Sequence, residues 1–282
     1  MNFIFPLLAA VLQAGSFTID KVVLGIRRVS FKTYISISFP LIFLITFIIF
    51  ALFRPPFSSE LLAGSLGYLL FVSIAMIMVT NLLFYRALDE DRLGEIQTLD
   101  LLHSIPIIVF SSIIFADERR FFVVLPALIA SGAIIWSHWE HHHFKIRRNT
   151  MPFLLWSLAA APIGASISKV LLSAWNPISL EFVRSGALAV LFGAIFHRQR
   201  KSVPLQTLPL FILTNVLSAV AWILFYFSYQ RSGIIYTILL FSLQPLLVYF
   251  ASLIFLKEPL QPKKITAFLI VLASIVVAQI NS

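Results

Sequence analysis

Ten runs of apolar residues, most of them close to twenty residues long, follow one another along the whole chain. An α-helix needs about 20 apolar residues to cross the ~30 Å hydrocarbon core of a bilayer. Because backbone groups in lipid must bond within their own segment, the runs predict helices rather than barrel strands. Their cores are residues 3–19, 33–53, 61–84, 93–115, 121–136, 151–174, 180–196, 208–227, 234–255 and 265–280. The predicted fold class is all-α, a polytopic membrane protein with ten transmembrane helices.

The composition excludes a soluble domain. Hydrophobic residues make up 60% of the 282 residues and charged residues 12%, with a mean hydropathy of +0.96. A soluble domain of this size could not cover so much apolar surface. The chain has no cysteine, which excludes disulfides, thiolate metal sites and a cysteine nucleophile. The first apolar run starts at Phe3 without a basic segment before it, so we expect a retained span rather than a signal peptide.

Three features recur in the same order in both halves of the chain. They are a lysine near the end of an apolar run, a run that ends in Leu-Phe-Tyr, and a glutamate after a later run. The matching pairs are Lys21 and Lys169, Tyr85 and Tyr226, and Glu118 and Glu258. A repeated apolar unit is typical of membrane transporters, whose substrate site lies where the two copies meet.

The longest polar break, residues 137–150, lies midway along the chain. We therefore predict a first five-helix repeat at 1–138, a polar linker at 139–150 and a second five-helix repeat at 151–282. Since five is odd, the second repeat must start on the opposite side of the bilayer from the first. The two repeats are then inverted relative to each other, as in many alternating-access carriers.

The net charge of +9 comes from short loops between apolar runs, which favours membrane orientation over nucleic-acid binding. The odd-numbered loops hold fifteen Lys and Arg residues and the even-numbered loops four. The positive-inside rule then places the odd loops in the cytoplasm and both termini outside. We expect a multi-pass protein of a plasma membrane of the bacterial inner-membrane type, with the lipid bilayer as a partner and no nucleic acid.

The second half carries short motifs of a known family. Lys169 is followed by Pro177 and Arg184, and Gln244-Pro245 is followed by Glu258. This pattern resembles the EamA-type family of the drug/metabolite transporter superfamily. The first half departs from it, with Phe31 and Ser38 where the family's Pro and Arg would stand. The resemblance implies a ten-helix carrier with a central cavity between the repeats. Such proteins commonly export amino acids, metabolites or drugs, and related families move nucleotide sugars or polar lipids.

Asp100 and His103 stand three residues apart in the fourth apolar run and share one helix face. A charge within a span costs roughly 2.5 to 3.5 kcal/mol, so ionisable residues there favour a function. Protonation of this pair could alternate with substrate binding. Two structural alternatives remain open. The pair could be an interhelical hydrogen bond that fixes packing, or the helix could lie nearer the loop, where both groups are solvated.

Three cations near or within spans are further candidates. Lys21 and Lys169 could attract an anionic group of the substrate, or their side chains could extend to the membrane interface. Arg184 follows Glu181 by three residues, which predicts an ion pair on one helix face. The alternative role for Arg184 is a contact with a substrate anion.

Aromatic and amide side chains complete the predicted pathway. Tyr85 and Tyr226 recur with the repeat, Trp222 lies one turn before Tyr226, and Gln244 interrupts the ninth run. They could line a cavity for an apolar or aromatic substrate, although interfacial aromatics are equally common. Glu118 and Glu258 are better explained by helix capping or the helix dipole. The histidines around His141 are better explained as a solvated basic loop than as a metal site.

The function predicted from these residues is secondary active transport of a small organic solute by alternating access, with export as the favoured direction and protons as a candidate coupling ion. The alternative is a flippase for a lipid-linked or polar-headgroup substrate. An intramembrane enzyme that uses His103 and Asp100 is less favoured. No phosphate loop, paired metal-ligand motif or serine-hydrolase elbow is found in the sequence. We therefore predict no enzyme activity, no cofactor and no metal, in a monomer or homodimer.

Overall fold

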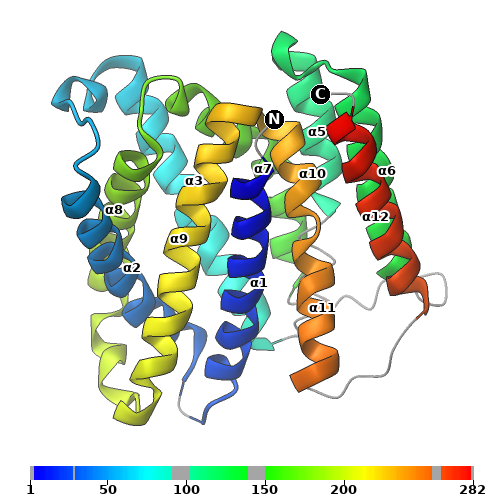
Figure 1. Ribbon diagram of the computed structural model, residues 1–282. Coiled ribbons are helices and arrows are strands. Elements are labelled where there is room, and N and C mark those ends of the chain that lie inside the picture. Colours follow the sequence, from blue (N-terminus) through cyan, green and yellow to red (C-terminus); the bar gives the residue numbers. More distant parts are fainter. Residues whose placement is uncertain (1–2, 28, 91–101, 139–149, 256–261, 281–282) are drawn as a thin grey trace.

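The computed structural model describes residues 3–27, 29–90, 102–138, 150–255 and 262–280, and every regular element in these ranges is a helix (Figure 1). The α-helices are α1 (Ile4–Leu24), α2 (Phe31–Phe53), α3 (Gly64–Glu90), α5 (Ser104–Ile114), α6 (Phe121–His138), α7 (Met151–Leu172), α8 (Pro177–Phe196), α9 (Leu208–Ser232), α10 (Ile234–Phe241), α11 (Gln244–Phe255) and α12 (Pro262–Ile280). Short 3-10 turns are η1 (Ser59–Leu62), η2 (Ala116–Glu118), η3 (His197–Ser202) and η4 (Leu205–Thr207).

Within the described residues, eight helical segments are long and apolar enough to cross a membrane, with α10 and the start of α11 counted as one segment, 234–251. The shorter apolar helices α5 and α6 lie where the fourth and fifth spans were expected. The predicted all-α, polytopic membrane fold is confirmed.

Local chemistry sets several helix ends. The side chain of Asn176 accepts a hydrogen bond from the amide of Ile178 (2.9 Å) and Pro177 occupies the first turn, so α8 begins there. Ser30 caps α2 in the same way by accepting from Thr33. At the end of α9, Gly233 has a φ of +88°, a conformation that glycine adopts at little cost. The chain can therefore turn at once into α10.

The ninth span is broken into α10 and α11 by Pro245. Proline has no amide hydrogen for the carbonyl of Phe241, four residues earlier, where α10 ends. Between the two helices, the amide of Leu243 donates to the carbonyl of Leu240 (3.2 Å), three residues earlier. The helix resumes at Gln244. Discontinuous helices of this kind often supply the binding site of a carrier.

Helices at corresponding places in the two halves run in opposite directions. Lys21 near the end of α1 contacts the end of α3, where its Nζ donates to the carbonyl of Leu88 (2.6 Å). Lys169 near the end of α7 contacts η2, where its Nζ lies 2.5 Å from Glu118. Both chain ends lie at the upper edge of Figure 1. We call this side the termini face; it also carries the connections at 54–63, 115–120, 173–176 and 233.

The main packing pairs each join one helix from the first half to one from the second. They are α1 with α9, α2 with α8, α6 with α12 and α3 with α7. Small residues let α6 and α12 approach closely, with Ala130 and Ala267 fully buried. Between α2 and α8, Thr46 and Ser185 share a hydrogen bond of 2.7 Å, and Phe50 stacks on Phe182 with ring centroids 4.6 Å apart.

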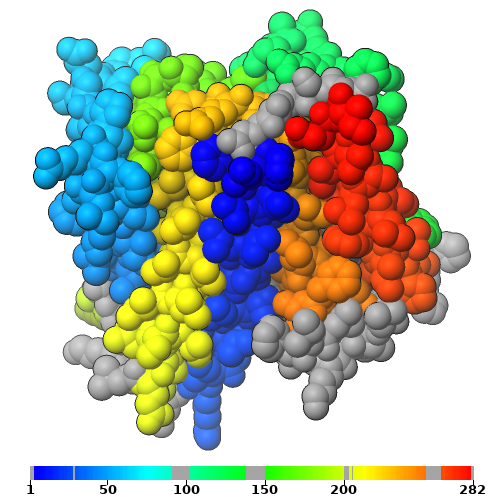
Figure 2. Space-filling model, in the orientation of Figure 1, coloured from blue at the N-terminus to red at the C-terminus, as the bar shows by residue number. Residues whose placement is uncertain are grey.

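The outer surface is apolar, and the mainly apolar interior also holds many polar side chains. Leu52, Phe71 and Val190 are among the most exposed side chains, whereas many serines and threonines are buried. On the side shown in Figure 2, α9, α1, α11 and α12 lie next to one another and form a continuous wall. Such an exterior suits contact with lipid tails, and it leaves the polar groups facing inward.

Candidate functional site: a central cavity and a charged cluster

A cavity of about 310 Å³ lies in the interior, and helices of both halves form its wall. Six of the side chains predicted for the pathway line it: Tyr85, His103, Arg184, Trp222, Tyr226 and Gln244. They come from α3, the start of α5, α8, α9 and α11. Residues far apart in sequence are thus brought to one space, as expected for a site where two repeats meet.

Arg184 is the buried cation of this cavity, with an exposed fraction of 1%. Its Nε donates to Oγ of Ser73 (3.2 Å) and its Nη2 donates to Oγ of Ser168 (3.2 Å). The guanidinium carbon lies 5.3 Å from the ring centroid of Tyr226, within the range of a cation–π contact. Its Nη1 is buried and has no hydrogen-bond partner among the described residues.

Glu181 also lines the cavity, one helical turn before Arg184. The ion pair expected between these two side chains is not present in the described part of the chain, where Arg184 bonds to two serines instead. The sequence could not reveal this, because Ser73 and Ser168 lie on other helices. Arg184 therefore lies near the carboxylate of Glu181 without forming an ion pair with it in the described part of the chain.

Aromatic rings form much of the remaining wall. Trp222 and Tyr226 have centroids 5.9 Å apart, and Phe225 lies 4.5 Å from Tyr229. Tyr85 extends this wall toward α2, with its ring 4.8 Å from that of Tyr34. The cavity thus combines flat apolar surfaces with a few polar groups, the usual make-up of a small-molecule site.

A stretch of small residues in α7 opens onto the cavity. Ala160, Ala161, Gly164 and Ala165 all line it. Small side chains there leave room between α7 and its neighbours. Gln244 also lines the cavity, at the start of α11 and beside the break in the ninth span.

A second, more polar pocket of about 420 Å³ lies at the termini face, and we call it the vestibule. Its charged lining consists of Asp117, Glu118, Arg120, Lys169 and Arg231. Tyr229 lines both the vestibule and the central cavity. The two spaces are therefore neighbours, and the side chains between them decide whether they connect.

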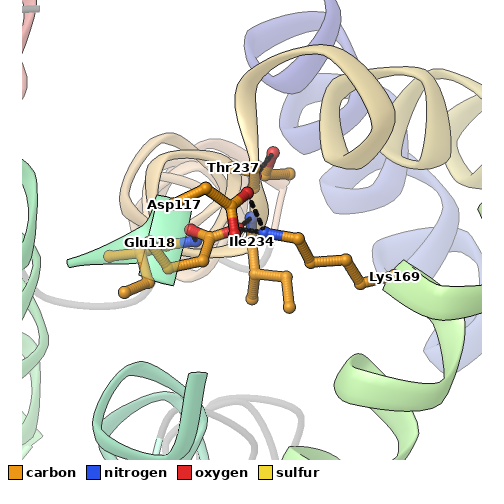
Figure 3. Close-up of polar contacts among 7 residues, drawn as sticks. Asp117, Glu118, Lys169, Ile234 and Thr237 are labelled. Atoms are coloured by element: carbon orange, nitrogen blue, oxygen red, sulfur yellow. Dashed lines mark hydrogen bonds and ion pairs between the residues drawn. The ribbon is translucent and has the colours of Figure 1, made fainter. Parts of the chain in front are cut away.

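Asp117, Glu118 and Lys169 form a charged cluster in the vestibule, shown in Figure 3. Nζ of Lys169 lies 2.5 Å from Oδ2 of Asp117 and 2.5 Å from Oε1 of Glu118. The carboxylate of Glu118, 5% exposed, also accepts hydrogen bonds from the amides of Ile234 (2.7 Å) and Ile235 (3.1 Å). The hydrogen bond from Lys169 lowers the pKa of Asp117 below its ordinary value.

Glu118 caps a helix of the other half of the chain. The first amides of a helix have no partner within the helix and carry a partial positive charge, which a carboxylate neutralises. From the sequence, Glu118 was expected to serve the helix that follows it. In the structure it serves α10, more than a hundred residues later, because η2 brings it against Gly233.

Lys21 and Lys169, for which contact with a substrate anion was one of two alternatives, are not among the residues that line the central cavity. Lys169 is held by two carboxylates, and its side chain is 17% exposed. Lys21 lies at the opposite face, where it donates to the carbonyl of Leu88. Both side chains are long enough to reach partners at the ends of neighbouring helices. Asp100, the predicted partner of His103, lies outside the described residues, as do Glu258 and His141.

Asp20 is a buried carboxylate that sequence reasoning missed. Its side chain is 1% exposed and accepts hydrogen bonds from the hydroxyls of Tyr34 and Thr214. It was placed outside the first span because the apolar run ends at Ile19, but α1 continues to Leu24. The contacts of Asp20 link α1 to α2 and α9.

Helices that alternate in direction, two halves packed face to face and a partly polar cavity between them define a multi-pass membrane protein with the architecture of a carrier. Residues 150–279 match the model of the EamA-like transporter family, and this confirms the resemblance predicted from the motifs of the second half. The second half of the chain is therefore similar to a family of membrane transporters.

A solved crystal structure has the same fold over almost the whole chain. It superposes with a TM-score of 0.75 at 13% sequence identity and covers 98% of this chain and 96% of its own. At this identity the likeness concerns the fold alone. Comparison with curated protein sequences gives no match.

Proposed function

We propose that the protein is a secondary active carrier that moves a small organic solute across the plasma membrane by alternating access. The central cavity supports this proposal most directly. It lies between the two halves, combines apolar walls with an incompletely bonded arginine, and adjoins a vestibule at one face. Such a chamber is what a carrier needs to hold a solute away from both sides of the membrane.

The charged cluster acts as the gate at the termini face in this proposal. Glu118 belongs to the first half of the chain, whereas Lys169 and the amides of α10 belong to the second. Their contacts hold the two halves together between the vestibule and the cavity. To open this face, the halves must separate and these contacts must break.

Proton exchange is the proposed driving force, and export is the proposed direction. His103 lines the cavity, and an imidazole ring can take up and release a proton. Asp100, on the same predicted helix face, is the proposed second member of the proton pathway. Binding of protons and binding of solute would then favour different states of the carrier.

Flux into proteoliposomes tests the proposal. Purified protein should catalyse uptake or exchange of water-soluble solutes from a panel of amino acids, carboxylates and drugs, and an imposed pH gradient should drive accumulation. Liposomes without protein and liposomes with a collapsed gradient are the controls. Movement of a labelled lipid headgroup without movement of any water-soluble solute would contradict the carrier and favour a flippase.

A further inference from the structure

We infer that the central cavity binds organic monocarboxylates that carry an aromatic or branched apolar body, with Arg184 as the group that holds the carboxylate. This inference rests on the proposed carrier function and deepens it by naming the class of solute. The observation behind it is the bonding of one buried guanidinium group.

Arg184 is incompletely bonded by the protein. Ser73 and Ser168 accept from Nε and Nη2, and both acceptors are neutral hydroxyls. Nη1 is buried and has no partner in the part of the chain that the structure describes. A buried donor of a charged group that lacks an acceptor is costly. An anionic ligand in the cavity would supply the missing acceptor.

The serines also fix the position of the guanidinium group. With Nε and Nη2 held from α3 and α7, the Arg184 plane has little freedom to rotate. A site arranged before the ligand arrives loses less entropy on binding. Arginine is well suited to this task because its donors match the geometry of a carboxylate.

Glu181 limits the charge of the ligand. It lines the same cavity one turn from Arg184 and forms no ion pair with it in the described part of the chain. A ligand with two negative charges would be repelled by this carboxylate at short range. A monocarboxylate balances Arg184 and adds the least repulsion, so it is favoured over a phosphonate or phosphate dianion.

The wall next to Arg184 suits an apolar body. Tyr226 lies against the guanidinium group, Trp222 lies against Tyr226, and Phe225 and Tyr229 continue the surface. A volume of about 310 Å³ equals roughly ten water molecules in the liquid. The cavity therefore holds a solute with on the order of ten non-hydrogen atoms, the size of a phenyl ring with a short acid chain.

Three probes of similar size test the inference on the purified protein in nanodiscs. They are 3-phenylpropionate, its uncharged isostere 3-phenylpropanamide and the dianion benzylphosphonate, with binding measured by calorimetry and by quenching of tryptophan fluorescence. We expect the carboxylate to bind at least tenfold more tightly than the amide and the dianion. Equal affinity of the wild-type protein for the carboxylate and the amide, or no binding of the carboxylate, would overturn the inference.

Variants then assign the effect to the cation. Arg184→Gln should lower carboxylate affinity at least tenfold and leave amide affinity unchanged. Arg86→Gln is the matched control, since Arg86 is an exposed arginine of α3 that pairs with Glu90 (3.4 Å), and it should change neither. Should Arg184→Gln fail to fold, Tyr226→Leu keeps the charge and removes a ring, and both probes should then weaken in parallel. Unchanged carboxylate affinity in a folded Arg184→Gln protein would overturn the inference.

The binding assay separates this inference from the carrier proposal. Tight carboxylate binding without flux of any solute would uphold the anion site and contradict the carrier. Flux of neutral or cationic solutes by a protein that binds no carboxylate would uphold the carrier and contradict the anion site.

Discussion

A β-carbon on Gly233 would lie 2.7 Å from Oε1 of Glu118. Gly233 also has a φ of +88°, which residues with a side chain rarely adopt. The glycine therefore permits the close approach by which a carboxylate of the first half caps a helix of the second. One position thus serves both the turn between α9 and α10 and the charged cluster.

Gly233→Ala should destabilise the folded protein by about 1–3 kcal/mol, because it combines backbone strain with displacement of a buried carboxylate. Thermal unfolding in nanodiscs measures the effect. Gly132→Ala is the matched control, since Gly132 is a helical glycine and a β-carbon added there would meet no atom within 4 Å. This control should be neutral or slightly stabilising. Equal unfolding temperatures for wild type and Gly233→Ala would contradict the structural role of Gly233.

Glu118→Gln should open the termini face more often, because the buried ion pair with Lys169 is lost while the size of the side chain is kept. The chain has no cysteine, so Ser157→Cys in the cavity wall can be labelled without background. We expect labelling by a water-soluble maleimide to quicken about tenfold, equivalent to about 1.4 kcal/mol.

Glu60→Gln supplies the control for this labelling experiment. Glu60 is an exposed glutamate of η1 at the same face, and its replacement should leave the labelling rate unchanged. A rate in Glu118→Gln that equals that of the parent protein would show that the cluster does not gate the cavity.

Acidification should weaken the charged cluster through Asp117. The hydrogen bond from Lys169 lowers the pKa of this carboxyl in the folded protein. A lowered pKa stabilises the fold above the unfolded pKa of about 3.9, and this contribution is lost as the pH falls through the folded value. Asp117 is largely exposed, so the effect should be small.

The corresponding measurement is the unfolding temperature of wild type and Asp117→Asn as a function of pH. We expect wild type to be the more stable protein near pH 6 and the difference to shrink below about pH 4. A difference that grows on acidification would have the wrong sign for this account.

Asp100→Asn should abolish flux driven by a pH gradient and leave the folded protein intact. The expectation follows from the proposed proton pathway, in which Asp100 and His103 exchange protons with the cavity. Flux in proteoliposomes and the unfolding temperature are measured on the same preparation. Unchanged gradient-driven flux would remove Asp100 from the mechanism.

The Asp20 contacts should stabilise the association of α1 with α2 and α9. Thr214→Val and Tyr34→Phe each remove one donor to this buried carboxylate, and each should cost about 0.5–2 kcal/mol. Thr18→Val is the control, because the hydroxyl of Thr18 bonds only within α1, to the carbonyl of Ala14 (2.8 Å). A larger loss from Thr18→Val than from Thr214→Val would contradict the role of Asp20.

The spans were predictable because the thickness of a bilayer fixes the length of an apolar helix. The break in the ninth span was not predicted, because residues 234–255 were expected to form one span although Gln244-Pro245 lies inside it. The end of α1 was not predicted either, because Asp20 and Lys21 look like a loop in sequence although both lie within the helix. Their partners on other helices make this position stable, and no local pattern contains those partners.

The residues that line the cavity were predictable only in part. The duplicated Tyr85 and Tyr226 and the motif residue Arg184 do reach it. Ser73 and Ser168, which hold Arg184, gave no signal because serine is common in membrane helices. Lys169 matched the repeat, but its position depends on Glu118, about fifty residues away in sequence, so only the folded arrangement shows what Lys169 contacts.

The two serines that bond to Arg184 are synthesised before it, and this affects how α8 enters the membrane. Helices enter the membrane from the N-terminus onward, and an arginine near the centre of one raises the cost of insertion by roughly 2.5–3.5 kcal/mol. Ser73 and Ser168 both precede Arg184 in the chain. When α8 leaves the translocon, the two hydroxyls that will bond its cation have therefore already been delivered to the bilayer.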